Sequence, residues 1–540
     1  MKIFEKLMNK KIEYFIFFLF VLGVLWLKEI NFLFYETWES PDFEKYFVYI
    51  QHFFDNSQTS KEHGLLYYYL HALNYEFFYS DSSNIYLSIH KSVQQVNFYI
   101  FLFGLLGYYI LFRHFNFSKL SIYLSFIFIN FFPPSISMRI VFKPEILAFA
   151  LMPWIIYFIE KYSKDRKLKH LFLCIPFLVS AITIKGNVLV ILSVYLFLSY
   201  FVLIFKIKLK NILFIIFLFL SATIAITLEN NSANGKTILD IQSGSTIEDN
   251  YNFKAPKSII YKTDLYKLVS SPIKHTHADS FIAITLLETT GDYFDLYWDN
   301  DGANYFKNRK QYFEFIQSNE IAGPKFNSEN LTFTIYQQKN TDIYLYESLG
   351  LVISIYLFYL LIKNCFQDKK YKKFLLGSFL GMIIILFHSI AGIPVNNFDP
   401  LVGDTFKPLY YSFILIFSFA FLIVILFESK KIRITTLFVY VFLIIFMLGF
   451  PKYLDYDLQV NLVQKIENSA YCEIEKNIYL KNSDFENINC NNKIRNNNES
   501  EYSKLFQNDL NHKPFNLGLL VINLLVCFYV LFNRRTYKTA

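Results

Sequence analysis

The chain of 540 residues is poor in charge, in glycine and in cysteine, and each shortage removes a class of protein. Only 18% of its residues are charged and 54% are apolar, which excludes an ordinary soluble enzyme and a disordered protein. The chain has 17 glycines, and they do not lie in the pattern of a P-loop or of a dinucleotide-binding fingerprint. Its five cysteines lack the spacing of a zinc or iron–sulfur site, so we expect no metal and no cofactor.

Long apolar blocks are what the chain has instead. A bilayer core about 30 Å thick needs about 20 apolar residues per helix. The blocks therefore predict an all-α polytopic membrane protein with about 12 transmembrane helices, at 13–34, 96–112, 120–138, 140–159, 170–184, 188–205, 212–228, 347–363, 374–394, 409–427, 434–450 and 515–533.

Basic residues lie between these blocks and orient the chain. The 52 basic and 44 acidic residues do not gather on one soluble face, so the excess does not indicate nucleic-acid binding. Lysine and arginine instead fill every second loop, which predicts a cytoplasmic N-terminus. The organisation that follows is a membrane core at 1–228, a large outer loop at 229–346, four spans at 347–450, an outer loop at 451–514, and a last span with a cytoplasmic tail at 515–540.

Three long segments are then expected on the outer side. In the first, 35–95, aromatic residues recur at helical spacing after Asp42 and again after Leu65, which predicts two helices lying in the membrane interface. In the second, a strand-like stretch from Leu331 predicts a small mixed insertion. In the third, Cys472 and Cys490 share one loop in an oxidising compartment, so we expect them to form a disulfide.

Acidic residues gather directly after the first apolar block. Glu36, Glu39 and Asp42 lie close together at the outer membrane surface, where a carboxylate beside an apolar wall is a candidate general base. The Ser40-Pro41 step favours a turn that leaves Asp42 at the start of the next helix. The alternative is that Ser40 or Asp42 only caps that helix.

Charges also occur in the short turn between the third and fourth blocks. Arg139, Lys143 and Glu145 lie close to hydrocarbon there, and charged groups at membrane depth indicate function with partners nearby. The two cations are suited to a phosphate or an acidic partner. The alternative is that Glu145 and these cations neutralise one another.

Two further cations lie on the outer side. Lys185 occupies the very short turn between the fifth and sixth blocks, and a lysine that snorkels to the interface is the alternative to a functional role. Lys407 precedes the tenth block, beyond a passage that begins at His388, and can receive a lipid phosphate there. That passage also reads as an ordinary turn rich in proline and glycine.

In this order, the motifs SPDFEKYF from Ser40, EHGLLYYYL from Glu62 and RIVFKPEILAFA from Arg139 resemble the GT-C class of integral-membrane glycosyltransferases. The chain is most similar to the bacterial branch related to protein mannosyltransferases and aminoarabinose transferases, best over the first seven blocks. Lys185-Gly186 also fits a short outer turn of that family. The family's consecutive acidic pair is spread here over Glu36, Glu39 and Asp42.

The resemblance implies sugar transfer on the outer face of a bacterial inner membrane, from a polyprenyl-phosphate-linked donor to an envelope glycan, lipid or protein. It implies Asp42 as general base, with Glu36 or Glu39 as substitutes, and Glu145 as the residue that orients a substrate. The resemblance further implies that the donor phosphate is bound by four cations, Arg139, Lys143, Lys185 and Lys407. It implies that the substrates are positioned by His63, Tyr67 and His388.

Other classes of membrane protein remain open. An O-antigen polymerase or ligase also has many spans and a large outer loop, and differs in having its essential residues in the later loops. A secondary transporter has a similar number of spans, but many show internal repeats and charges near the midplane. A membrane scaffold without catalysis is a further alternative.

Overall fold

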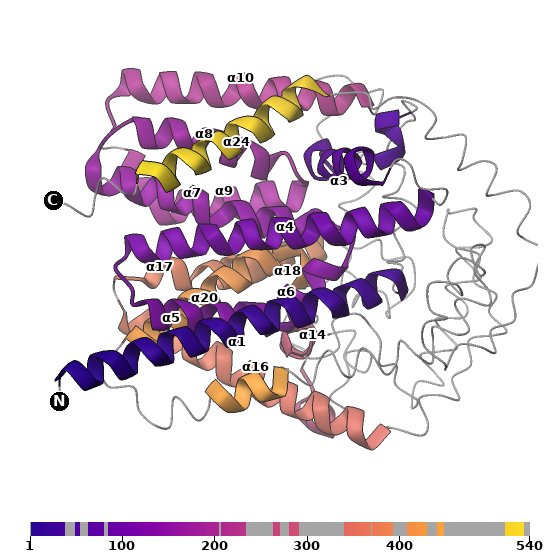
Figure 1. The fold of residues 1–540 in the computed structure, drawn as a ribbon, viewed down its shortest axis with the longest axis vertical. Coiled ribbons are helices and arrows are strands. Elements are labelled where there is room, and N and C mark those ends of the chain that lie inside the picture. The colour runs from indigo at the N-terminus through magenta and orange to yellow at the C-terminus, as the bar shows by residue number, and fades with distance from the viewer. Residues whose placement is uncertain are drawn as a thin grey trace, which may run out of the picture. The chain divides into compact units, whose positions relative to one another are not determined.

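The structure is a computed structural model. It describes residues 2–37, 49–54, 63–79, 85–204, 207–233, 263–270, 280–290, 340–368, 370–392, 408–428, 440–447 and 513–533. Over these ranges the regular structure is helical, with a single isolated β-bridge between His63 and Lys185 and no strand (Figure 1). The strand-like stretch from Leu331 lies outside the described residues.

Several of the described helices are long and apolar enough to cross a membrane, so the chain is an all-α membrane protein. Five helices meet this condition alone, at Lys91–His114, Glu145–Asp165, Leu209–Asn230, Ser348–Gln367 and Pro514–Leu531. A sixth arises if Lys119–Phe131 and Pro133–Arg139, which are bent by 64°, form one broken span. Each of the twelve apolar blocks contains described helix, but that all twelve cross the membrane stays a prediction.

The described helices belong to two compact units, each built from separated stretches of the chain. The first unit holds α1 (Lys2–Thr37), α5 (Lys119–Phe131), α13 (Leu265–Ser270), α14 (Phe281–Thr290), α16 (Asn340–Gln367), α17 (Lys372–Leu375), α18 (Gly377–Gly392), η4 (Pro408–Tyr411), α20 (Ser412–Glu428) and the helical residues 440–447. Its centre is α20, where Phe419 packs against Phe128, Phe132 and Phe358. The described parts of the large loop, α13 and α14, are helical.

The second unit contains the residues discussed below. It holds the helical residues 49–54, α3 (Leu65–Phe78), α4 (Ile85–His114), α7 (Glu145–Asp165), α8 (Lys169–Ile182), α9 (Gly186–Ile204), α10 (Leu209–Ala233) and α24 (Pro514–Asn533). The apolar stretch of α7 is 78% buried and that of α10 is 6% buried, so α7 is central and α10 presents its side chains outward. Helix α3 contacts α4 and α24 and lies at one end of α10 and α24 (Figure 1).

Close packing of α4 against α7 depends on a small residue. A Cβ at Gly107 would lie 2.7 Å from Nε1 of Trp154, so no larger side chain fits without movement. The Trp154 ring is fully buried and stacks on Phe103 and Phe177, which belong to α4 and α8. These contacts tie α4, α7 and α8 together near the middle of α7.

Two of the differences between the helix boundaries and the apolar blocks have a clear physical cause. Helix α4 begins at Ile85 rather than near 96, because its polar first turns pack against α3: Ser92 Oγ donates to the carbonyl of His71 at 2.9 Å. The block at 120–138 is broken at Phe132, since Pro133 lacks the N–H that would continue α5 and starts α6 (Pro133–Ile140) in a new direction. The apolar residues of a block predict which stretch of a helix faces hydrocarbon. Contacts with neighbouring helices and the position of proline decide where the helix begins and ends.

Candidate functional site

The core of the candidate site is a buried ion pair at one end of α7 and α8. Glu145 is the first residue of α7, where the helix dipole favours a negative charge, and Lys185 lies in the turn that follows α8. Lys185 Nζ lies 2.8 Å from Glu145 Oε1, and the side chains are 16% and 1% exposed. The sequence analysis gave Arg139 and Lys143 as the alternative cations to neutralise Glu145, whereas in the structure Glu145 forms its ion pair with Lys185.

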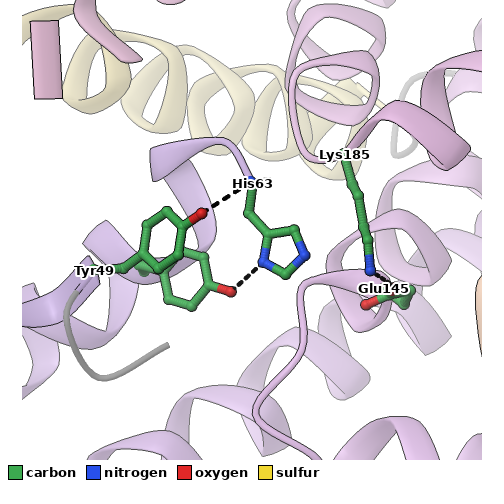
Figure 2. Close-up of polar contacts among 5 residues, drawn as sticks. Tyr49, His63, Glu145 and Lys185 are labelled. Carbon is green, nitrogen blue, oxygen red and sulfur yellow. Dashed lines mark hydrogen bonds and ion pairs between the residues drawn. The ribbon is translucent and has the colours of Figure 1, made fainter. Parts of the chain in front are cut away.

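The first long segment reaches this pair through its backbone. His63 and Lys185 form an antiparallel β-bridge, and the amide of Gly64 donates to the carbonyl of Ile184 at 2.7 Å. A Cβ on residue 64 would lie 1.8 Å from the carbonyl oxygen of Thr183, so only glycine permits this approach. Figure 2 shows the His63 ring between a pair of tyrosines and the Lys185–Glu145 pair.

Two tyrosines hold His63 in this position. The hydroxyl of Tyr68 lies 2.6 Å from His63 Nδ1, and the hydroxyl of Tyr49 accepts the His63 backbone N–H at 3.0 Å. The rings of Tyr49 and Tyr68 stack at 4.3 Å, and both are fully buried. The imidazole is therefore fixed in place by groups from two helices.

Tyr67 links α3 to the turn that carries Glu145. Its hydroxyl donates to Asn97 Oδ1 at 2.9 Å, and Asn97 Nδ2 donates to the carbonyls of Arg139 at 3.1 Å and Val141 at 3.3 Å. Burial raises the pKa of Tyr67 well above its usual value, so the phenol stays a donor. Asn97 thus joins three segments that are distant in sequence.

His71 lies one turn further along α3 and is fully buried. Its ring contacts Tyr67 and Phe142 edge-on, with centroids 4.4 and 5.1 Å apart. Among the described residues, neither ring nitrogen has a hydrogen-bond partner. Burial lowers the pKa of His71 to about 3, so the ring is neutral at ordinary pH.

The two cations beside Glu145 in sequence have different surroundings. The side chain of Arg139 is 1% exposed, and its guanidinium carbon lies 4.4 Å from the centroid of the Phe101 ring. Lys143 is only partly buried, in the turn between α6 and α7. Lys143 and Lys185 therefore keep some solvent exposure, whereas Arg139 has almost none.

The structure thus brings His63, Tyr67, Glu145 and Lys185 into one compact unit with Arg139 and Lys143. Glu36 lies on α1 and His388 on α18, with side chains that the structure does not describe. The other predicted residues, Glu39, Asp42, Lys407, Cys472 and Cys490, lie outside the described ranges, so their roles stay predictions.

Several residues of this site were not among those singled out in the sequence. Asn97 lies inside an apolar block, where a polar side chain is itself a signal of function or packing. Tyr49 and Tyr68 gave no such signal, because tyrosine is common throughout the chain. Within the described part of the chain, no group of three or more histidine, cysteine, aspartate or glutamate residues is arranged to hold a metal ion.

Comparison of the chain with family models, with curated proteins and with solved structures found no match. The resemblance to membrane glycosyltransferases therefore depends on the motifs and on the chemistry of the residues themselves.

Proposed function

We propose that the chain is a GT-C-like membrane glycosyltransferase with twelve spans, which moves a sugar from a polyprenyl-phosphate donor to an acceptor in the cell envelope. The single observation that supports this most is the buried Glu145–Lys185 pair, because the first long segment is joined to it at the His63–Lys185 bridge. A carboxylate and an ammonium group are thus held next to the segment whose sequence also carries Glu39 and Asp42.

The proposed reaction is a substitution at the anomeric carbon of the donor sugar. The acceptor hydroxyl attacks that carbon, the bond to the phosphate oxygen breaks, and the lipid phosphate leaves with the bonding electrons. The proton of the acceptor passes to a carboxylate, for which we propose Asp42, with Glu36 or Glu39 as substitutes. No metal or cofactor is required for this balance of charge and protons.

Lys185 is suited to the phosphate that gains charge as the bond breaks. An ammonium group carries three hydrogens, so it can contact a phosphate oxygen while it keeps its bond to Glu145. Lys143, in the neighbouring turn, adds a second positive charge. Glu145 Oε2 is buried without a hydrogen-bond partner among the described residues, and in this proposal it accepts a hydrogen bond from a substrate hydroxyl.

The test compares envelope glycans and glycoproteins from cells with and without the gene, by mass spectrometry. We expect one sugar to disappear from one class of envelope molecule, and Glu145→Gln to give the same loss at normal protein levels. Polymer chains that become shorter with unchanged sugar composition would instead identify a polymerase or ligase. An unchanged envelope would refute the proposal.

A further inference from the structure

A buried polar junction lies beside His63 and Gly64, formed by α10 and α24 and by the first residue of α3. Glu229 and Asn230 occupy the last turns of α10, and Asn516 lies in the first turn of α24. Their side chains are 8%, 4% and 0% exposed, respectively. These three residues, with the amide of Leu65, are called the polar junction below.

Glu229 fastens α24 to α10. Its Oε1 accepts the amide of Phe515 at 3.0 Å, and its Oε2 accepts the amide of Asn516 at 2.8 Å and the Asn516 side chain. The first amides of a helix have no partner within the helix, and the dipole there favours an anion. Glu229 therefore supplies from α10 the cap that α24 needs.

Asn230 continues the junction to the first long segment. Its Oδ1 accepts the amide of Leu65 at 3.3 Å and the Asn516 side chain at 3.4 Å. Gly64, at the N-cap of α3, offers no side chain to cap the helix, so Asn230 does this from α10. The amides of residues 64 and 65 are thus held by different partners, Ile184 and Asn230.

We infer that Asn230 is a positioning residue, which holds the turn at His63 and Gly64 against the turn at Lys185 and so keeps His63 beside the Glu145–Lys185 pair. The inference rests on the proposed function for its catalytic consequence, whereas its structural part stands alone. The Asn230 bond holds the first residue of α3 from α10, next to the Gly64–Ile184 bond, whereas the Tyr67–Asn97 and Ser92–His71 bonds hold later residues of α3 to α4. Glu229 and Asn516 hold Asn230 itself in place.

The chain offers a matched control for a substitution at Asn230. Asn523, also on α24, is 5% exposed and donates one buried hydrogen bond to Ser180 Oγ at 2.7 Å. Both Asn230→Ala and Asn523→Ala remove a buried amide from the same unit, so both should lower the unfolding temperature. Only Asn230→Ala removes a bond to the first long segment.

The test combines hydrogen–deuterium exchange with transfer kinetics on the full chain in detergent. For Asn230→Ala we expect faster exchange in a peptide covering 63–68, and a decrease in kcat of about tenfold, within the loss that a displaced group causes. The KM for the polyprenyl-phosphate donor should change less than twofold, roughly as for pure orientation. Asn523→Ala should change neither the exchange nor kcat.

Equal exchange at 63–68 in Asn230→Ala and Asn523→Ala would overturn the inference. If Asn230→Ala does not fold, Asn230→Leu removes the same acceptor at nearly constant volume, and unchanged exchange in that variant has the same meaning. Faster exchange with normal kcat would refute the positioning role and leave the proposed function intact. Faster exchange in a chain whose unaltered form transfers no sugar would refute the proposed function and leave the junction standing.

Discussion

Lys185 and Glu145 form an ion pair at 2.8 Å in which the carboxylate is 1% exposed and the lysine side chain 16% exposed. The two residues meet because α7 and α8 follow one another, so that the start of the first helix and the end of the second lie at the same end. A charge buried to this extent depends on its partner, which makes the pair sensitive to the loss of either member.

Lys185→Met should destabilise the protein more than Glu145→Gln, because it leaves a buried carboxylate without its cation. We expect a loss of about 3 kcal/mol for Lys185→Met, near the lower end of the range for broken buried pairs. The double variant should recover part of this loss. The free energies of unfolding of the unaltered protein, both single variants and the double variant, measured in detergent, form a double-mutant cycle that gives the coupling between Lys185 and Glu145. If the losses of the two single variants simply add in the double variant, the prediction is wrong.

Gly64→Ala should separate the first long segment from the turn at Thr183. The added methyl group would lie 1.8 Å from a backbone oxygen, which cannot move as a side chain does. We expect a loss of at least about 2 kcal/mol, as for overpacked sites. Gly186→Ala is the control, because a Cβ there meets nothing within 4 Å. Equal stability of the two variants would show that this close approach is absent.

The stability of the protein should depend on pH through His71. Because the folded pKa is about 3 and the unfolded pKa about 6.5, the unfolded chain binds more protons between these values. Stability is therefore full above about pH 6.5 and falls by up to about 1.4 kcal/mol per pH unit below it. His71→Leu should remove this component. Parallel pH profiles for the two proteins would contradict the prediction.

Asp42→Asn should reduce transfer by about 10²–10⁴, the contribution of a positioned general base. The substitution keeps the shape of the side chain and removes its charge, so folded protein and donor binding should be preserved. Glu36→Gln and Glu39→Gln serve as comparisons in the same assay. Normal transfer by Asp42→Asn together with an inactive Glu36→Gln or Glu39→Gln would assign the base to the other carboxylate.

Reporter fusions test the orientation of the chain. The basic segment around Lys167 is expected in the cytoplasm, and Asn300, in the large loop, outside. Fusions at these two positions should therefore report opposite sides. The same side for both would mean that the twelve-span topology is wrong.

The sequence could predict the helices but not all of their ends. Apolar blocks located α8 and α24 closely and α7 and α10 less closely, since a membrane helix needs a minimum apolar length. The break at Pro133 was missed because the residues on both sides are apolar, and hydropathy does not record a change of direction. Aromatic spacing also predicted α3, whose sequence LLYYYLHALNYEFF is helical throughout.

The site could be predicted only in part. Glu145 and Lys185 were each recognisable as charges near hydrocarbon, but their pairing depends on how α7 and α8 turn back on one another. Asn230 and Asn516 carried little signal, because a polar residue at the end of an apolar block has an ordinary explanation. Contacts between segments so distant in sequence are decided by packing, which a local pattern does not contain.

The polar junction also has a consequence for biosynthesis. His63, Glu145, Lys185 and Asn230 are all translated long before α24, and the Glu229 carboxylate accepts the amides of Phe515 and Asn516, which belong to that late helix. Domains generally fold as they emerge from the ribosome, so α10 is made well before the helix whose first amides Glu229 accepts. A nascent chain that stops before Pro514 would lack these two donors to Glu229. Assembly of the polar junction is therefore a late step in the synthesis of the chain.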